Sequence, residues 1–200
     1  MSRRLVVVIL AGFLIGALAG AAALVLTKGP ATPGVATTGK ALVGGPFTLV
    51  DQTGKTVTER DFRGRYILVF FGFTHCPDIC PAELQVIAES MKALGPHAKK
   101  VVPVFITVDP ERDTPEVMAD YFKNFGDEFV GLTGSTEQIA AVAKAYRVTY
   151  AKFQETDSAT EYSIDHSALL YLMGPNGDYI THLPYGTGAQ EMTETLRRYL

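Results

Sequence analysis

The chain has 200 residues, of which 47% are hydrophobic and 20% charged, so it is long enough for one ordinary domain with a single core. Its formal net charge is −3, but residues 1–40 hold four of the 18 basic side chains and none of the 21 acidic ones. Residues 41–200 therefore carry 14 basic groups against 21 acidic groups, a net charge of −7. This acidic balance argues against nucleic acid as a partner.

Residues 5–26 form an unbroken run of uncharged residues that is long enough, as a helix, to cross a hydrocarbon layer of about 30 Å. Arg3 and Arg4 precede the run, and basic residues favour the cytoplasmic side of a membrane. We therefore expect residues 1–4 in the cytoplasm, a single anchor over 5–26 in the inner membrane, and a C-terminal domain on the periplasmic side. A cleaved signal peptide is the alternative, although its apolar core spans only about 7–15 residues.

Residues 27–43 are rich in Gly, Pro, Ala and Thr without periodicity, which predicts a flexible tether. The remaining residues, 44–200, are predicted to form one domain. Its expected elements are a strand–turn–strand unit over 47–58, a buried strand over 66–73, a helix from Pro81 to Leu94, a strand over 101–108, helices over 114–125 and 135–146, a hairpin over 168–183, and a last helix marked by Met192, Leu196 and Tyr199. This order predicts an α/β sandwich with a mixed central sheet, as in the thioredoxin-like fold.

Cys76 and Cys80 are the two cysteines of the chain, and they lie between the buried strand and the helix from Pro81. With Cys80 near the helix N-cap and Cys76 just before it, the helix dipole and free N–H groups should stabilise the thiolate form. Thiolate is needed both for metal binding and for disulfide exchange. Outside the cytoplasm such a pair oxidises unless it is reduced or metallated, so a redox-active disulfide is expected. A plain structural disulfide is the alternative.

His166 is expected at the start of the strand facing the dithiol, where thioredoxin-like proteins ordinarily carry a cis-proline; residues 162–170 contain no proline. An imidazole there completes a set of two thiols and one imidazole, and no fourth ligand for structural zinc is evident. Thiolates at low coordination number suit Cu(I), and imidazole helps to retain Cu(II), so the pattern predicts a copper site. A hydrogen-bonded histidine at a strand end is the alternative.

The other three histidines are weaker candidates. His75 adjoins Cys76, but its side chain should point away along an extended strand, so it is a reserve ligand. His97 lies in a Gly-Pro loop and His182 on a hairpin strand, and both are expected at the surface.

Three aspartates are candidates for tuning the charge of the site or for contacting a partner. Asp78 stands between the cysteines, Asp165 precedes His166, and Asp109 follows the buried strand over 101–108. Turn formation and helix capping explain most of the composition around Asp109 without any function.

Four linked segments of the chain resemble the Sco/SenC family of membrane-anchored copper chaperones over roughly residues 45–200. They are residues 71–81 with the Cys-Pro-Asp-Ile-Cys motif, 107–115, 165–166 and 171–177. The resemblance implies a thioredoxin-like fold, copper bound by Cys76, Cys80 and His166, and a role in maturing the binuclear copper centre of a haem–copper (cytochrome c) oxidase. The implied partners are the copper-binding subunit of that oxidase and another copper donor protein.

A membrane-anchored thiol–disulfide oxidoreductase that keeps copper-site cysteines reduced is the alternative function. Peroxiredoxins share the fold and carry Thr three residues and Pro seven residues before the reactive cysteine. Phe73 and Val69 occupy these positions before Cys76, and Pro77 and Phe73 occupy them before Cys80, so peroxidase activity is not expected. We expect a chaperone with ancillary thiol chemistry rather than an enzyme, because a purely structural tethered binder leaves the three donors unexplained.

Overall fold

The computed structural model describes residues 42–154 and 162–200. The expected anchor over 5–26 and nearly all of the expected tether over 27–43 lie outside the described residues. Within the described ranges, no helix is long and apolar enough to span a membrane.

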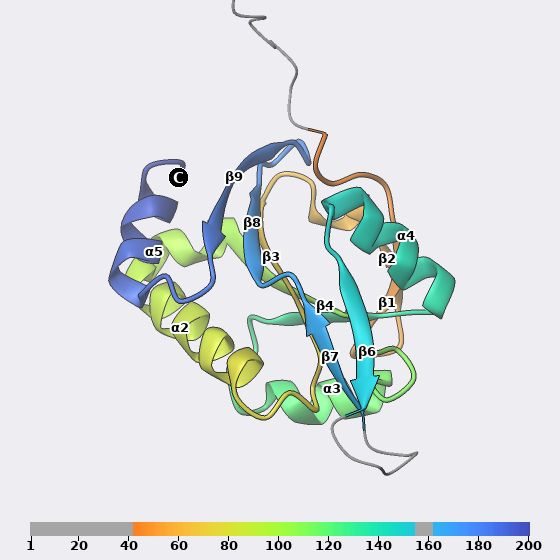
Figure 1. Cartoon of the computed structure of the whole chain (residues 1–200). Coiled ribbons are helices and arrows are strands. Elements are labelled where there is room, and N and C mark those ends of the chain that lie inside the picture. Colours follow the sequence, from red (N-terminus) through yellow and green to blue (C-terminus); the bar gives the residue numbers. More distant parts are fainter. Residues whose placement is uncertain (1–41, 155–161) are drawn as a thin grey trace, which may run out of the picture. The chain divides into compact units, whose positions relative to one another are not determined.

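A mixed sheet forms the centre of the described residues, with seven strands in the order β2-β1-β5-β4-β3-β8-β9 (Figure 1). These strands are β1 (Thr48–Asp51), β2 (Thr56–Thr58), β3 (Tyr66–Gly72), β4 (Val101–Thr107), β5 (Val130–Thr133), β8 (Leu169–Met173) and β9 (Tyr179–Pro184). The three central strands β5, β4 and β3 are parallel, whereas β8 runs antiparallel to β3 and β1 runs antiparallel to β5. The predicted α/β architecture with a mixed central sheet is therefore confirmed.

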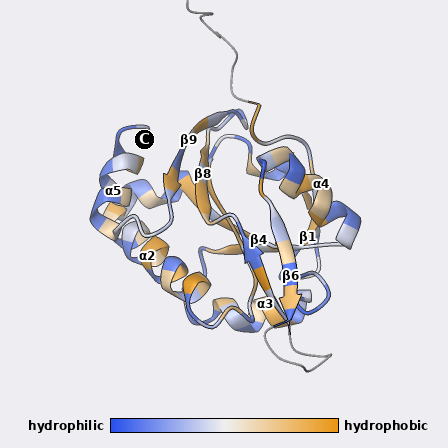
Figure 2. Ribbon diagram, viewed as in Figure 1, coloured by the Kyte–Doolittle hydropathy of each residue, from blue (hydrophilic) through white to orange (hydrophobic). Residues whose placement is uncertain are grey.

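The two central strands β3 and β4 are buried along nearly their whole length. Both are runs of β-branched and aromatic residues, which suit a strand with both faces covered. Their register pairs Val69 with Val104 and Phe70 with Phe105, and the rings of this second pair meet edge to face. Figure 2 shows the hydrophobic residues concentrated on the central strands, with mixed surfaces on the helices.

Helices cover the sheet, with α2 and α5 packed together on one side and α4 on the other (Figure 1). They are α2 (Ile79–Leu94), α3 (Pro115–Phe122), α4 (Thr136–Tyr146) and α5 (Ala189–Arg197), with short 3-10 helices η1 (Glu59–Phe62) and η2 (Gly95–Lys100). Ser135 and Gln138 form the capping box predicted for α4. The start of α2 differs from the prediction: the helix begins at Ile79 with Asp78 at its N-cap, so Cys80 lies inside the first turn.

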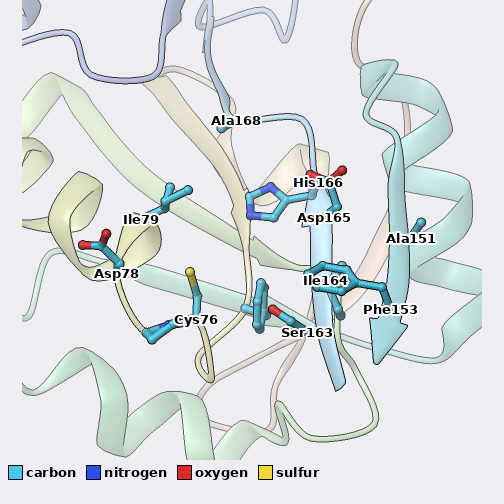
Figure 3. A pocket seen from close by; sticks show the side chains of 12 residues that line it. Cys76, Asp78, Ile79, Ala151, Phe153, Ser163, Ile164, Asp165, His166 and Ala168 are labelled. Atoms are coloured by element: carbon cyan, nitrogen blue, oxygen red, sulfur yellow. The ribbon is translucent and has the colours of Figure 1, made fainter. Parts of the chain in front are cut away.

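A second, two-stranded sheet consists of β6 (Tyr150–Gln154) and β7 (Tyr162–His166), and these strands pair only with each other. The sequence patterns did not predict this hairpin. The expected position of His166 is also wrong in detail, because His166 ends β7, opposite Tyr150, and does not begin the strand β8. The hairpin brings His166 close to the first turn of α2, where its ring points toward the cysteine loop (Figure 3).

Candidate metal centre

The Cys80 thiol is completely buried in the first turn of α2. It occupies space that a glycine leaves open at the end of β3. A Cβ atom added at Gly72 would lie 2.8 Å from the Cys80 sulfur and 2.8 Å from the Phe105 ring, closer than real Cβ contacts allow. Gly72 is thus required by the position of the sulfur, a role that sequence reasoning missed.

Cys76 lies half-buried in the loop before α2, where its sulfur accepts a hydrogen bond from the backbone N–H of Cys80 at 3.4 Å. A hydrogen bond from the Cys80 thiol, assisted by backbone N–H groups including those of Asp78 and Ile79, lowers the pKa of Cys76 to about 5. The same thiol–thiol hydrogen bond, together with burial, raises the pKa of Cys80. The hydrogen bond from Cys80, helped by the backbone N–H groups at the start of α2, therefore favours a thiolate on Cys76, whereas Cys80 keeps its proton.

His166 brings an imidazole nitrogen to the dithiol. Its Nε2 atom lies 3.8 Å from the Cys80 sulfur, and its Nδ1 atom lies 3.2 Å from the carbonyl oxygen of Ser167. A carbonyl can only accept, so this contact selects the tautomer with the proton on Nδ1 and leaves the Nε2 lone pair facing the sulfur. The rings of Phe73 and Phe70 hold the imidazole edge-on, at centroid distances of 6.0 and 6.3 Å.

The Cys80–His166 separation fits one shared metal ion. Metal–thiolate and metal–imidazole bonds of about 2.3 and 2.0 Å together exceed the 3.8 Å between the two atoms. However, among the described residues no three His, Cys, Asp or Glu side chains are arranged to hold a metal ion. Cys80 and His166 are already close enough to share a metal ion. A movement of Cys76 or His166 is needed to bring all three ligands together.

Cys76 and His166 face a hollow of roughly 610 Å³ between the cysteine loop and the β6–β7 hairpin. Figure 3 shows the His166 ring reaching from β7 toward the loop that carries Cys76. Two large apolar side chains on the rim, Ile79 and Phe153, are 39% and 47% exposed. The hollow leaves the thiol–imidazole group open to another molecule from one side.

The predicted aspartates occupy different environments. Asp78 and Asp165 are exposed and line the hollow, and their tuning or docking roles stay predictions. Asp109 is fully buried, so its carboxylate does not belong to a docking surface. It accepts a hydrogen bond from the Tyr162 hydroxyl at 2.7 Å and pairs with Arg112, because the loop after β4 folds inward against the hairpin.

The other histidines do not line the hollow that Cys76 and His166 share. His97 and His182 are exposed, as predicted. His75 is also exposed, and its Nδ1 atom lies 3.1 Å from the Thr74 hydroxyl and 3.8 Å from the buried carboxylate of Asp113. Burial raises the pKa of Asp113, which holds the cysteine loop by accepting the Thr74 backbone N–H at 3.0 Å.

The fold and the site together define a thioredoxin-like protein in which a dithiol loop faces a histidine. The sequence model of the family described as SCO1/SenC matches residues 35–200, so the chain belongs to the SCO1/SenC family. A curated relative, "Protein SCO1 homolog 1, mitochondrial" from Arabidopsis thaliana, is 48% identical over 143 residues. That alignment covers 71% of this chain but only 42% of the Arabidopsis protein.

Solved structures show the same fold. "Structure of Bradyrhizobium japonicum ScoI with copper bound" superimposes with a TM-score of 0.73 at 44% identity, covering 79% of this chain and 99% of that chain. BsSco, described as having a disulfide switch and as a member of the Sco family of cytochrome c oxidase assembly proteins, gives a TM-score of 0.63 at 25% identity, covering 79% of this chain and 93% of that chain. The predicted thioredoxin-like fold is therefore that of the Sco proteins.

Proposed function

We propose that the protein is a copper metallochaperone that binds copper through Cys76, Cys80 and His166 and delivers it to a haem–copper oxidase. The observation that carries this proposal is the 3.8 Å approach of the Cys80 sulfur to Nε2 of His166, beside the thiolate-favouring Cys76. Thiolates and imidazole are the ligands that copper prefers among protein side chains. A Sco structure with 44% identity to this chain holds copper, which supports the choice of metal.

Copper is the cargo of this site, and the site is suited to releasing it. Two sulfurs and one nitrogen leave the ion short of a full tetrahedral set, so an incoming ligand can add before a resident one leaves. The hollow beside Cys76 and His166 gives that ligand a route from solvent. Exchange through such a shared intermediate avoids releasing free copper.

The recipient we propose is the copper-binding subunit of a cytochrome c oxidase, with another protein as copper donor. The support is the family itself, since BsSco is described as a member of a family of oxidase assembly proteins. Anchoring through residues 5–26 would hold the domain beside a membrane-bound oxidase on the periplasmic side. Ile79 and Phe153 on the rim of the hollow give a partner chain apolar surface to bury.

A second candidate function, thiol–disulfide exchange, is supported by the unequal cysteines. The half-exposed Cys76 thiolate can attack a partner disulfide and form a mixed disulfide, releasing one partner thiolate. The buried Cys80 then gives its proton to the partner thiolate released first and attacks the Cys76 sulfur, which closes the Cys76–Cys80 bond and releases the second partner thiolate. The partner gains two electrons and this chain loses them.

Substitution of His166 distinguishes copper delivery from thiol–disulfide exchange, because only copper delivery needs the imidazole. Cells that depend on this protein should lose copper loading of the oxidase when they carry His166→Ala, because the variant keeps both sulfurs but lacks the imidazole. Cys76→Ser should fail as well, and His182→Ala, an exposed histidine on β9, serves as the matched control. Full oxidase activity with His166→Ala and none with Cys76→Ser would identify a thiol reductase instead of a copper carrier.

A further inference from the structure

The loop after β4 forms hydrogen bonds with the hairpin that carries His166. The Asp109 carboxylate, completely buried, accepts a hydrogen bond from the Tyr162 hydroxyl at 2.7 Å and pairs with Nε of Arg112. Nη1 of Arg112 donates to the backbone carbonyl of Tyr162 at 3.1 Å. Tyr162, the first residue of β7, is thus held at its hydroxyl and at its backbone.

The same guanidinium lies over two aromatic rings. Its central carbon lies 3.8 Å from the ring centroid of Tyr162 and 5.9 Å from that of Phe73. The Phe73 ring in turn meets the His166 imidazole edge-on, at 6.0 Å and an interplanar angle of 83°. Phe73 therefore links Arg112 to His166.

The hairpin needs such an anchor because it does not join the main sheet. An isolated two-stranded hairpin is marginally stable at best in water. Tyr162 and His166 stand at the two ends of β7 on the same face, about 13 Å apart, with the buried Ile164 between them. Fixing β7 at Tyr162 therefore fixes the direction in which the strand presents His166.

Stability alone does not account for this ion pair, in which Asp109 is fully buried and the Arg112 side chain is 23% exposed. Among the described residues, Nη2 of Arg112 is buried and has no hydrogen-bond partner. Replacing a buried ion pair by apolar residues of the same volume is often neutral or stabilising, and an unpaired buried N–H is an added cost. The planar guanidinium of Arg112 binds a carboxylate and a carbonyl and lies over two rings. Such a set of directional contacts fixes the position of the hairpin. By contrast, the Lys152–Glu111 pair near it is exposed and adds little.

We propose that Arg112, held by Asp109 and Tyr162, is a positioning residue for His166. It places the β6–β7 hairpin so that Nε2 of His166 stays within reach of the Cys80 sulfur. Arg112 does not touch the metal and acts only through the hairpin and Phe73. The inference rests on the proposed copper-binding function, because its consequence is measured as copper affinity.

The test compares Cu(I) affinity of the purified full-length chain, by competition with a chromophoric Cu(I) chelator, between wild type, Arg112→Lys and Tyr162→Phe. Lysine keeps the charge but lacks the planar guanidinium that binds Asp109 and the Tyr162 carbonyl together and lies over the Tyr162 ring. Tyr162→Phe removes only the hydroxyl. Arg112→Lys should weaken binding about tenfold or more, as for other residues that support metal ligands. The matched control, Arg63→Lys, alters an arginine that binds the backbone carbonyl of Asn176, away from the hollow, and should leave the affinity unchanged.

The same substitutions in a His166→Ala background separate positioning from general destabilisation. With the imidazole gone, Arg112→Lys should cause no further loss of affinity, and the rate of Cys76–Cys80 disulfide formation should be unchanged in both backgrounds. An equal loss in both backgrounds, or no loss in either, overturns the inference. If Arg112→Lys does not fold, the same comparison is made with Tyr162→Phe, which keeps the ring and its volume.

Electron paramagnetic resonance of the Cu(II) form provides an independent readout. Wild type should show coupling to a histidine nitrogen, and Arg112→Lys should show it weakened or lost while the secondary structure is retained. Unchanged nitrogen coupling in Arg112→Lys would contradict the inference. Equal copper affinity of wild type and His166→Ala would instead contradict the proposed function, so the two failures are distinguishable.

Discussion

The Cys80 sulfur lies 3.8 Å from Nε2 of His166, although 86 positions separate the two residues in the sequence. One partner comes from the first turn of α2 and the other from the last residue of β7. Their approach depends on Gly72 behind the sulfur and on the Phe73 ring beside the imidazole. The site is therefore a product of tertiary packing, and its properties should respond to changes in residues that never touch a metal.

Oxidation should compete with copper. Metal binding needs both thiolates free, so a Cys76–Cys80 disulfide should abolish Cu(I) uptake until it is reduced. Titrating Cu(I) into oxidised and reduced chain under anaerobic conditions measures this. Equal uptake by the two forms would remove the cysteines from the site.

Cys76 should react as a thiolate well below neutral pH. Its pKa is lowered to about 5, so alkylation by iodoacetamide of the reduced, metal-free chain should stay fast at pH 6 and fall only near pH 5. Cys80 is buried with a raised pKa and should react only on unfolding. Mass spectrometry after timed quenching gives both rates.

Cys80→Ser is an informative partner for this alkylation measurement. The hydrogen bond from the Cys80 thiol is the main cause of the lowered pKa of Cys76. Because a C–O bond is shorter than a C–S bond, a serine hydroxyl stays closer to its own Cβ atom, and we expect it to donate to the Cys76 sulfur less well. The alkylation profile of Cys76 should then shift to higher pH. A wild-type profile centred near the ordinary thiol pKa of about 8.5 would contradict the assignment of Cys76 as the thiolate.

Gly72→Ala should displace the Cys80 sulfur. The new methyl group would lie 2.8 Å from that sulfur and from Phe105, so we expect overpacking to cost roughly 1–3 kcal/mol and Cu(I) affinity to fall. Gly45→Ala is the matched control, since the nearest heavy atom to a Cβ atom there is the Ala145 methyl group at 3.6 Å, an ordinary van der Waals contact. Chemical denaturation and chelator competition measure the two effects. Unchanged affinity in Gly72→Ala would show that the Cys80 sulfur is not packed against β3.

Glu83→Gln should stabilise the protein at high pH. Glu83 is 2% exposed, and among the described residues its Oε1 atom has no hydrogen-bond partner. Burial raises the pKa of this carboxyl, so the folded state favours the protonated form. The stability this group contributes is therefore present at low pH and lost as the pH rises through the folded-state pKa.

The expected gain from Glu83→Gln is about 1 kcal/mol at pH 8, with little change at pH 4. Thermal unfolding at the two pH values measures the difference. Glu89→Gln, on the exposed side of the same helix, is the control and should change neither value. A gain of equal size at pH 4 and pH 8 would exclude ionisation of Glu83 as the cause.

The fold was predictable wherever burial and local capping act together. The apolar runs of β3 and β4 and the capping box of Ser135 follow from local sequence, and these elements form as predicted. β5 was missed because it is short and contains Gly131, where Met118 and Phe122 pack so closely that a Cβ atom would lie within 3 Å of both. Such packing is a tertiary requirement that leaves no local pattern.

The site was predictable in composition but not in arrangement. The residue types of Cys76, Cys80 and His166 pointed to copper, whereas the strand that carries His166 was not expected. β6 has little burial to impose an alternating pattern, so its sequence resembles a loop. Asp109 likewise looked like a turn former, because its bonds to Arg112 and Tyr162 appear only once the hairpin is in place.

Copper analysis of the reduced full-length chain, with and without His166→Ala, tests the central claim most directly. Wild type should bind one copper ion per chain and show histidine nitrogen coupling in the Cu(II) form. His166→Ala should lose that coupling and most of its Cu(II) retention while still forming the Cys76–Cys80 disulfide at the wild-type rate, because thiol exchange depends on thiolate fraction and access. Identical copper content and identical spectra for the two proteins would contradict the thiol–imidazole copper site.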